Sequence, residues 1–186
     1  MEKFTNINYE QEEPEVVYEG DYKKIIKIDG WEVNKTTDSV ICVPYFEDTM
    51  EFVMRREVIP PYKFVDGEEK HLVCVAGLID ENETAEEAVY RELYEETGIV
   101  VKSNYSRLKK WRVLFSNKGS IMRIHMYYIP LINNEYDEVV APTDGSKFEK
   151  LADNVKIHIS HLKTLKPADA ISSLCIEYLK DELLIR

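Results

Sequence analysis

One stretch, residues 77–99, constrains this chain more than any other. Thr84 is followed three residues later by Glu87, which is the spacing of a capping box, so we expect a helix to begin near Ala85. Gly98 is expected to end it, because glycine adopts the left-handed conformation without strain. Between these points apolar residues recur at helical spacing and predict one buried face: Ala85, Ala88, Val89 and Leu93.

Three glutamates crowd the second half of this helix. Glu92, Glu95 and Glu96 stand at positions i, i+3 and i+4, so their carboxylates share one face. They also occupy the last two turns, where the helix dipole disfavours negative charge. Like charges at this spacing destabilise a helix unless another group offsets them, and a hard divalent cation with oxygen ligands would do so.

Two further charged residues flank the cluster. Arg91 directly precedes it, and Glu83 lies just before the helix. We expect a charge-assisted hydrogen bond between them that fixes the loop against the helix. The alternative, an ordinary solvated acidic helix, would explain neither Arg91 nor the two glycines nor the carboxylates gathered near the helix end.

The complete spacing resembles the Nudix box. The chain matches this motif at every fixed position, in the order Gly77, Glu83, Arg91-Glu92-Leu93, Glu95-Glu96, Gly98 and Ile99. The resemblance implies a mixed α/β fold, an α/β/α sandwich with an N-terminal β-hairpin and a C-terminal helix. It also implies hydrolysis of a phosphoanhydride with Mg²⁺, or Mn²⁺, as the cofactor that neutralises the phosphates and acidifies water.

The resemblance assigns roles within the box. It implies that Glu92 and Glu96 are the principal metal ligands, and that Glu95 is a ligand or positions a water molecule. The backbone carbonyl of Ala76 is expected to add a further ligand. Arg91 is expected to orient the carboxylates, with Glu83 as its partner.

The surroundings of the box resemble the ADP-ribose and nucleotide-sugar pyrophosphatases. The lead-in Ala76-Gly77-Leu78-Ile79-Asp80 matches the Ala-Gly-x-Ile-Asp approach of that subgroup. This resemblance implies a small-molecule nucleotide substrate, a nucleoside diphosphate linked to another moiety, with ADP-ribose or a nucleotide sugar first. The products would be a nucleoside monophosphate and a sugar phosphate, and the enzyme would be a homodimer.

Two departures from the subgroup keep other functions open. A Ser-Pro-Gly turn is usual after the box, whereas this chain has Ser116-Asn117-Lys118-Gly119, and Val58 stands where a second arginine is usual. The alternatives are hydrolysis of a nucleoside triphosphate, a dinucleotide or a cap, and a non-catalytic nucleotide-binding module. A purely structural acidic domain is a third alternative, which the carboxylate cluster disfavours.

Outside the box, a few residues are candidates for substrate contacts. Trp31, ahead of Tyr45, is placed to stack on a base, although packing across a strand pair explains Trp31 equally well. Arg55 or Arg56 is a candidate to hold a phosphate, with an ordinary surface arginine as the alternative. Gly77 is also a candidate to contact the substrate.

The general base is expected in the acidic segment 133–154, because the subgroup often brings a further catalytic carboxylate on a late loop. Distance from the final strand favours Asp153 or Glu149. A solvated acidic loop is the alternative interpretation.

Charge and cysteine content exclude some classes of function. A net charge of −11 argues against coating nucleic acid or an anionic membrane, but not against a phosphate-bearing substrate, because bound cations invert the local sign. The three cysteines lie in apolar runs and are expected to be free, buried thiols. No apolar run approaches the roughly 18 residues of a membrane-spanning helix, so a cytoplasmic location is the default expectation.

The rest of the chain predicts one domain. Residues 1–19 are expected to form a flexible acidic arm, and residues 20–186 a single domain. Segments 60–70 and 133–154 are expected to be loops. The patterns predict a hairpin over 22–35, a closing helix from Pro167, and strands over 38–46, 51–56, 71–75, 108–115, 121–132 and 155–160.

Overall fold

A computed structural model describes residues 12–20, 23–102, 107–142 and 147–184 of the chain. Two compact units emerge from its contacts. The smaller unit comprises residues 1–36 and 115–122, and the larger unit comprises residues 37–114 and 123–186. Each unit is described by itself below.

The smaller unit is built on an antiparallel sheet in the order β1 (Glu15–Glu19), β2 (Lys24–Ile28), β3 (Trp31–Lys35). Asp29 and Gly30 turn the chain between β2 and β3 with positive φ angles, as the predicted hairpin requires. Residues 15–19, which the sequence predicts to belong to a flexible arm, form β1 and pair with β2, in keeping with the strand propensity of this Val- and Tyr-containing segment. Residues 1–11 lie outside the described part of the chain.

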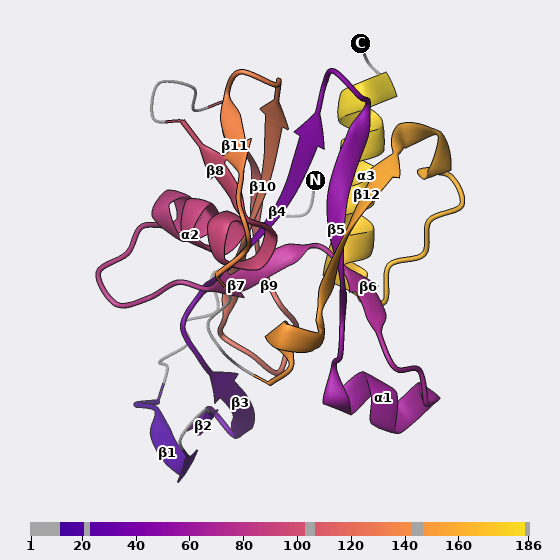
Figure 1. The fold of residues 1–186 in the computed structure, drawn as a ribbon. Helices are drawn as coiled ribbons and strands as arrows, with labels where there is room; N and C mark the ends of the chain where they lie inside the picture. Colours follow the sequence, from indigo (N-terminus) through magenta and orange to yellow (C-terminus); the bar gives the residue numbers. More distant parts are fainter. Residues whose placement is uncertain (1–11, 21–22, 103–106, 143–146, 185–186) are drawn as a thin grey trace, which may run out of the picture. The chain divides into compact units, whose positions relative to one another are not determined.

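The larger unit is built on a mixed sheet in the order β12-β5-β4-β10-β9, with β6 paired to β5 and β7 to β4 (Figure 1). β4 and β10 are parallel, and the other registered pairs of this sheet are antiparallel. This arrangement confirms the predicted mixed α/β fold class. The strands are β4 (Ser39–Phe46), β5 (Glu51–Glu57), β6 (His71–Val73), β7 (Val75–Leu78), β9 (Lys109–Phe115), β10 (Arg123–Leu131) and β12 (Asp153–His158).

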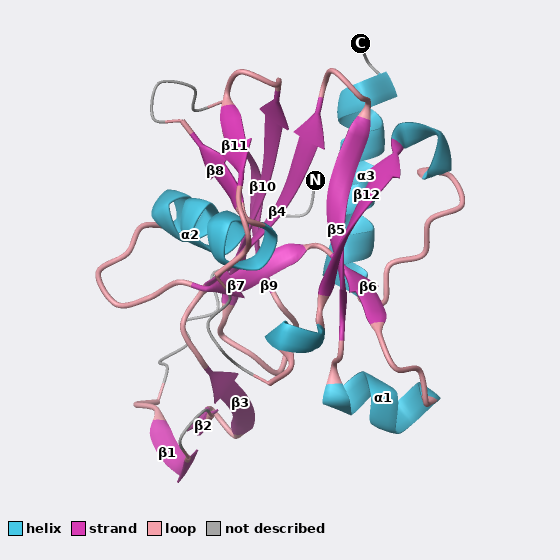
Figure 2. Ribbon diagram, viewed as in Figure 1, coloured by secondary structure: helices cyan, strands magenta, loops and turns pink. Residues whose placement is uncertain are grey.

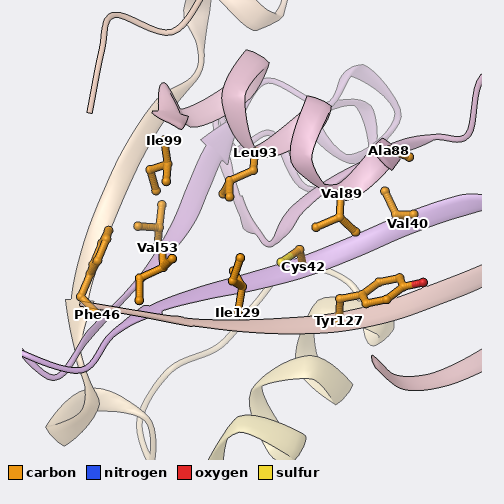
Figure 3. Packing of buried hydrophobic residues seen from close by; sticks show 11 residues of the cluster. Val40, Cys42, Phe46, Val53, Ala88, Val89, Leu93, Ile99, Tyr127 and Ile129 are labelled. Atoms are coloured by element: carbon orange, nitrogen blue, oxygen red, sulfur yellow. The ribbon is translucent and has the colours of Figure 1, made fainter. Parts of the chain in front are cut away.

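Helices cover both faces of this sheet (Figure 2). Figure 3 shows α2 (Ala85–Thr97) above the strands, with Val89 and Leu93 pointing at Val40 and Cys42 of β4, and the C-terminal helix below them. That second helix, α3 (Ala170–Leu184), buries one stripe against the opposite face, formed by Cys175, Ile176 and Leu179. Both helices thus use the apolar periodicity visible in the sequence.

Several predicted boundaries are wrong in detail. Residues 60–66 form a short helix, α1 (Pro60–Asp66), because proline is tolerated in a first helical turn and Gly67 ends the helix with φ 80°. The predicted loop 133–154 contains β11 (Tyr136–Glu138), paired with β8 (Ile99–Val101), and the 3₁₀ turn η1 (Glu149–Leu151). A second 3₁₀ turn, η2 (Ile159–His161), follows β12. α3 begins at Ala170 rather than at Pro167.

Candidate active site

The helix α2 begins with the capping box that the sequence predicts. The Thr84 hydroxyl accepts from the Glu87 backbone N–H at 3.2 Å, and the Glu87 carboxylate accepts from the Thr84 N–H at 2.8 Å. Gly98 ends the helix with φ 73°, and a Cβ there would lie 1.9 Å from the Val139 carbonyl oxygen. These two ends fix the register of the helix, and therefore the face on which its glutamates stand.

Arg91 is the centre of the hydrogen-bond network. Its guanidinium makes the predicted pair with Glu83 in bidentate form, Nε to Oε1 at 2.8 Å and Nη2 to Oε2 at 2.9 Å. This contact confirms the predicted bond between loop and helix, and it lowers the pKa of Glu83. Nη2 also donates to the Leu78 carbonyl at 2.8 Å, while Nη1 donates to Glu92 at 2.7 Å and to Glu95 at 3.1 Å.

Glu96 is the most buried of the three clustered glutamates of α2. It is 7% exposed, and its Oε2 accepts from the Ala76 backbone N–H at 3.2 Å. The Arg55 side chain, itself 3% exposed, lies with Nε 3.5 Å from Glu96 Oε1 and donates Nη1 to the Glu96 backbone carbonyl. Burial nevertheless raises the pKa of Glu96 well above its usual value, because Arg55 compensates only part of the lost hydration.

Gly77 makes room for Glu92. A Cβ at Gly77 would lie 1.8 Å from Oε1 of Glu92, so only glycine lets this carboxylate approach the β7 backbone. The structure therefore gives Gly77 a local role in seating a predicted metal ligand. Its predicted contact with substrate stays a prediction.

The site carries an excess of negative charge. Two guanidinium groups, those of Arg55 and Arg91, face the partly or fully buried carboxylates of Glu57, Glu83, Glu92, Glu95 and Glu96. Negative charges crowded in a poorly solvated place favour an added cation. The available donors are carboxylate oxygens and the adjacent backbone carbonyls, which is the donor set that Mg²⁺ and Mn²⁺ prefer.

The carboxylates of the cluster are not arranged around one common point. In the described part of the chain, no group of three or more acidic, histidine or cysteine side chains stands in an arrangement that could hold an ion. The contacts explain this result, because Arg91 Nη1 occupies the space between Glu92 and Glu95 while Glu96 turns to Arg55 and Ala76. The donor atoms fit a divalent ion by chemistry, and Glu92 and Glu95 would have to give up their hydrogen bonds to Arg91 Nη1 in order to serve as its ligands.

Asp153, a predicted general base, lies at the start of β12 in a different environment. Arg56, its neighbour across the strand pair, donates Nε to Asp153 Oδ2 at 2.8 Å, and Lys70 binds the other oxygen. The Lys70 bond and the positive charges lower the pKa of Asp153, which weakens it as a base. This ion pair supports a structural role for Asp153 and Arg56. The side chain of Glu149, the other candidate, lies outside the described residues.

The arginine and aromatic residues predicted to contact substrate also lie in different environments. Arg55 is buried and bonded to Glu57, Glu96 and Asn154, an environment that suits a residue positioning Glu96 rather than one holding a phosphate. Trp31 belongs to the smaller unit and is 62% exposed, so base stacking stays a prediction. Tyr45 is buried beside Tyr128, with ring centroids 6.2 Å apart, and does not offer a face for stacking.

Sequence reasoning missed two contributors. Glu57 accepts from Arg55 Nε at 2.7 Å, and Asn154 donates to the Glu96 carbonyl at 3.3 Å. Glu57 directly follows Arg55 and Arg56 at the end of β5. This adjacency is the sequence signal that could have identified Glu57 as an ion-pair partner of these arginines. The role of Asn154 depends on the pairing of β12 with β5, which the sequence does not reveal.

Comparisons with known proteins complete this description. Residues 35–170 match the family model described as the NUDIX domain. The chain is similar to a solved structure described as "Crystal structure of ADP compounds hydrolase", with a TM-score of 0.67 and 16% identity over 95% of this chain and 97% of that chain. At that identity the likeness shows the fold alone. A comparison with curated proteins gives no match. No helix in the described residues is long and apolar enough to cross a membrane.

Proposed function

Since the chain belongs to the Nudix family and is thereby a Nudix pyrophosphohydrolase, we propose that it cleaves the diphosphate of a nucleoside diphosphate linked to another moiety. ADP-ribose or a nucleotide sugar is the proposed substrate, giving a nucleoside monophosphate and a sugar phosphate. The observation that carries this proposal is the cluster of Glu92, Glu95 and Glu96 on the last turns of α2, in which Arg91 contacts Glu92 and Glu95 while Arg55 contacts Glu96.

Nudix enzymes generally use divalent cations, and we assign Mg²⁺, with Mn²⁺ as a substitute, to this cluster. The proposed ligands are Glu92, Glu96 and the Ala76 carbonyl, with Glu95 as a ligand or as the residue that positions water. Bound there, the ion neutralises phosphate charge and acidifies water. The bidentate Arg91–Glu83 pair holds the helix and loop in register while the carboxylates reorient.

Two likenesses support the proposed substrate class. The Ala76-Gly77-Leu78-Ile79-Asp80 lead-in resembles that of ADP-ribose and nucleotide-sugar pyrophosphatases, and the solved structure cited above is described as an ADP compounds hydrolase. Glu149 remains the proposed general base, because the ion pair of Asp153 with Lys70 and Arg56 occupies the other candidate. A homodimer, which the resemblance implies, is tested by light scattering on the full chain.

The decisive assay is Mg²⁺-dependent release of AMP from ADP-ribose, with Glu96→Gln as the inactive variant. Glu177→Gln serves as the matched control, because Glu177 is an exposed glutamate on α3 that pairs with Lys180. We expect a loss of about 100-fold or more in Glu96→Gln and none in Glu177→Gln. Hydrolysis that is independent of both Mg²⁺ and Glu96 would contradict the proposed site. Turnover of triphosphates or dinucleotides alone would retain the chemistry and replace the substrate.

A further inference from the structure

A pocket of about 410 Å³ adjoins the carboxylate cluster. It lies within the larger unit, and Ala76 and Glu57 line it. Both residues also belong to the site described above, because Ala76 donates to Glu96 and Glu57 accepts from Arg55. Its size is within the range of small-molecule pockets. The pocket and the carboxylate cluster therefore share Ala76 and Glu57 as common boundary residues.

The chemistry of the lining is specific. The walls are mainly aliphatic, with the side chains of Ile41, Ile59, Val73, Ile124 and Ile171. The charged groups among the lining residues of the described chain are the carboxylates of Glu57 and Asp169, and none is a lysine or an arginine. Tyr62 of α1 supplies an aromatic ring. Such a lining accepts hydrogen bonds from a ligand and disfavours an anion.

The N-terminus of α3 also lines this pocket, and the N–H groups of Ser172 and Ser173 there are already hydrogen-bonded to Asp169. Asp169 accepts from the Ser172 N–H at 2.7 Å and from the Ser172 hydroxyl at 2.7 Å. The Asp169 carbonyl accepts from the Ser173 N–H at 3.0 Å. An incoming phosphate would meet the Asp169 carboxylate at this helix end, and the repulsion between the two negative charges opposes binding of an anion there.

We propose that this pocket holds the uncharged, hydroxyl-bearing sugar ring that lies beyond the diphosphate of the substrate, and that Tyr62 determines specificity for it. The proposal rests on the proposed function. The hydroxyl groups of a sugar donate to Glu57 and Asp169, while its apolar face packs on Tyr62 and the aliphatic walls. A third phosphate in the same position would be desolvated beside two carboxylates with no cation to pair it.

Tyr62 is suited to this role by its position on a short surface helix. Its side chain is 36% exposed, and its ring stands edge-on to His71 with centroids 5.3 Å apart. Burial, together with the nearby Asp169 charge, raises the pKa of Tyr62, so the hydroxyl stays protonated and can hydrogen-bond a sugar. Phe64 lies on the same helix, is 92% exposed and is absent from the lining, so it provides a matched control.

The first test measures kcat and KM for ADP-ribose and for UDP-glucose, and the inhibition constant of ADP, which ends at its second phosphate. We expect Tyr62→Ala to raise KM for the better sugar-bearing substrate about tenfold, with kcat and the ADP inhibition constant changed less than about twofold. Phe64→Ala should change none of these values by more than about twofold. An unchanged KM in Tyr62→Ala overturns the assignment, and so does an equal weakening of ADP.

A second variant tests the charge argument and keeps a long side chain at the same position. Tyr62→Lys places an ammonium in the pocket, and we expect the ratio of ATP to ADP-ribose hydrolysis to rise about tenfold, whereas Phe64→Lys should leave it unchanged. No change in Tyr62→Lys counts against the pocket. Wild-type protein that hydrolyses ATP but no sugar-bearing diphosphate overturns this inference alone. Absence of any Glu96-dependent hydrolysis overturns the proposed function itself.

Discussion

Two acidic regions of the larger unit differ in how far cationic partners compensate their negative charge. On α2, Glu92 and Glu96 are buried, and the surrounding carboxylates outnumber the arginines that contact them. At the start of β12, Asp153 is 37% exposed and is paired with two cations, Lys70 and Arg56. Both regions were candidates for catalysis in the sequence, yet only the first retains uncompensated charge.

The difference shows what distinguishes a ligand-binding carboxylate from a structural one. When a carboxylate has a lowered pKa and two cationic partners, its charge is already compensated and a further cation adds little stabilisation. A buried group of carboxylates with too few partners is unfavourable until a cation joins it.

Replacing two of the α2 glutamates should remove the uncompensated charge that distinguishes α2 from the start of β12. In Glu92→Gln/Glu96→Gln we expect hydrolysis to fall by about 100-fold or more, because the proposed ligands lose their charge. Added Mg²⁺ or Mn²⁺ should raise the Tm of wild type but not of this variant, since only a bound ligand stabilises the native state. A Tm response to the ion that survives in the variant would move the metal site elsewhere.

Arg91→Lys keeps the charge of the network and removes its geometry. A lysine cannot make the bidentate contact with Glu83 while also reaching the Leu78 carbonyl, Glu92 and Glu95. We expect kcat to fall about 10- to 100-fold with the fold retained, measured by steady-state kinetics and circular dichroism. Arg56→Lys, on the Asp153 side, is the control and should change kcat less than about twofold. Equal losses in both variants would remove the distinction between the two regions.

Neutralising Glu96 alone should stabilise the ion-free protein while it inactivates the enzyme. Burial and the charges of Glu57 and Glu92 make the ionised form of Glu96 unfavourable, as its raised pKa indicates. In EDTA we expect Glu96→Gln to raise the free energy of unfolding by about 1 kcal/mol, which corresponds to a Tm increase of about 2–4 °C. A lower Tm than wild type would mean that Arg55 already compensates this carboxylate in full.

The sequence predicted the α2 region better than the rest because its determinants are local. The capping box, the Gly98 stop and the Arg91–Glu83 pair all lie within one short segment, and each is confirmed. The surroundings of Asp153 depend on pairing between strands that are far apart in the chain, which periodicity does not specify. The sequence predicts a loop over 60–70 where the structure has α1, because Pro60 and Pro61 favour a break in regular structure, whereas proline is also tolerated in the first turn of a helix.

Asp153→Asn is the smallest perturbation and the one that tests the structural side of the contrast. We expect kcat to stay within about twofold, because a general base would instead lose about 100-fold or more. The native pKa of Asp153 lies below its usual value of 3.8 through the Lys70 bond and the charge of Arg56. Its contribution to stability is therefore complete above about pH 4 and is lost as the pH falls through the native pKa.

The variant should accordingly have a Tm about 1–2 °C below wild type at pH 7, which is the scale of an exposed ion pair. The two Tm values should approach each other below about pH 4, where wild-type Asp153 also loses its charge. Thermal melts of both proteins between pH 3 and pH 8 measure this convergence. A collapse of kcat in the variant would place Asp153 with the catalytic carboxylates. A Tm gap that widened at low pH would instead show that its ion pair with Lys70 and Arg56 does not stabilise the native state, because the paired, charged form of Asp153 is lost in that range.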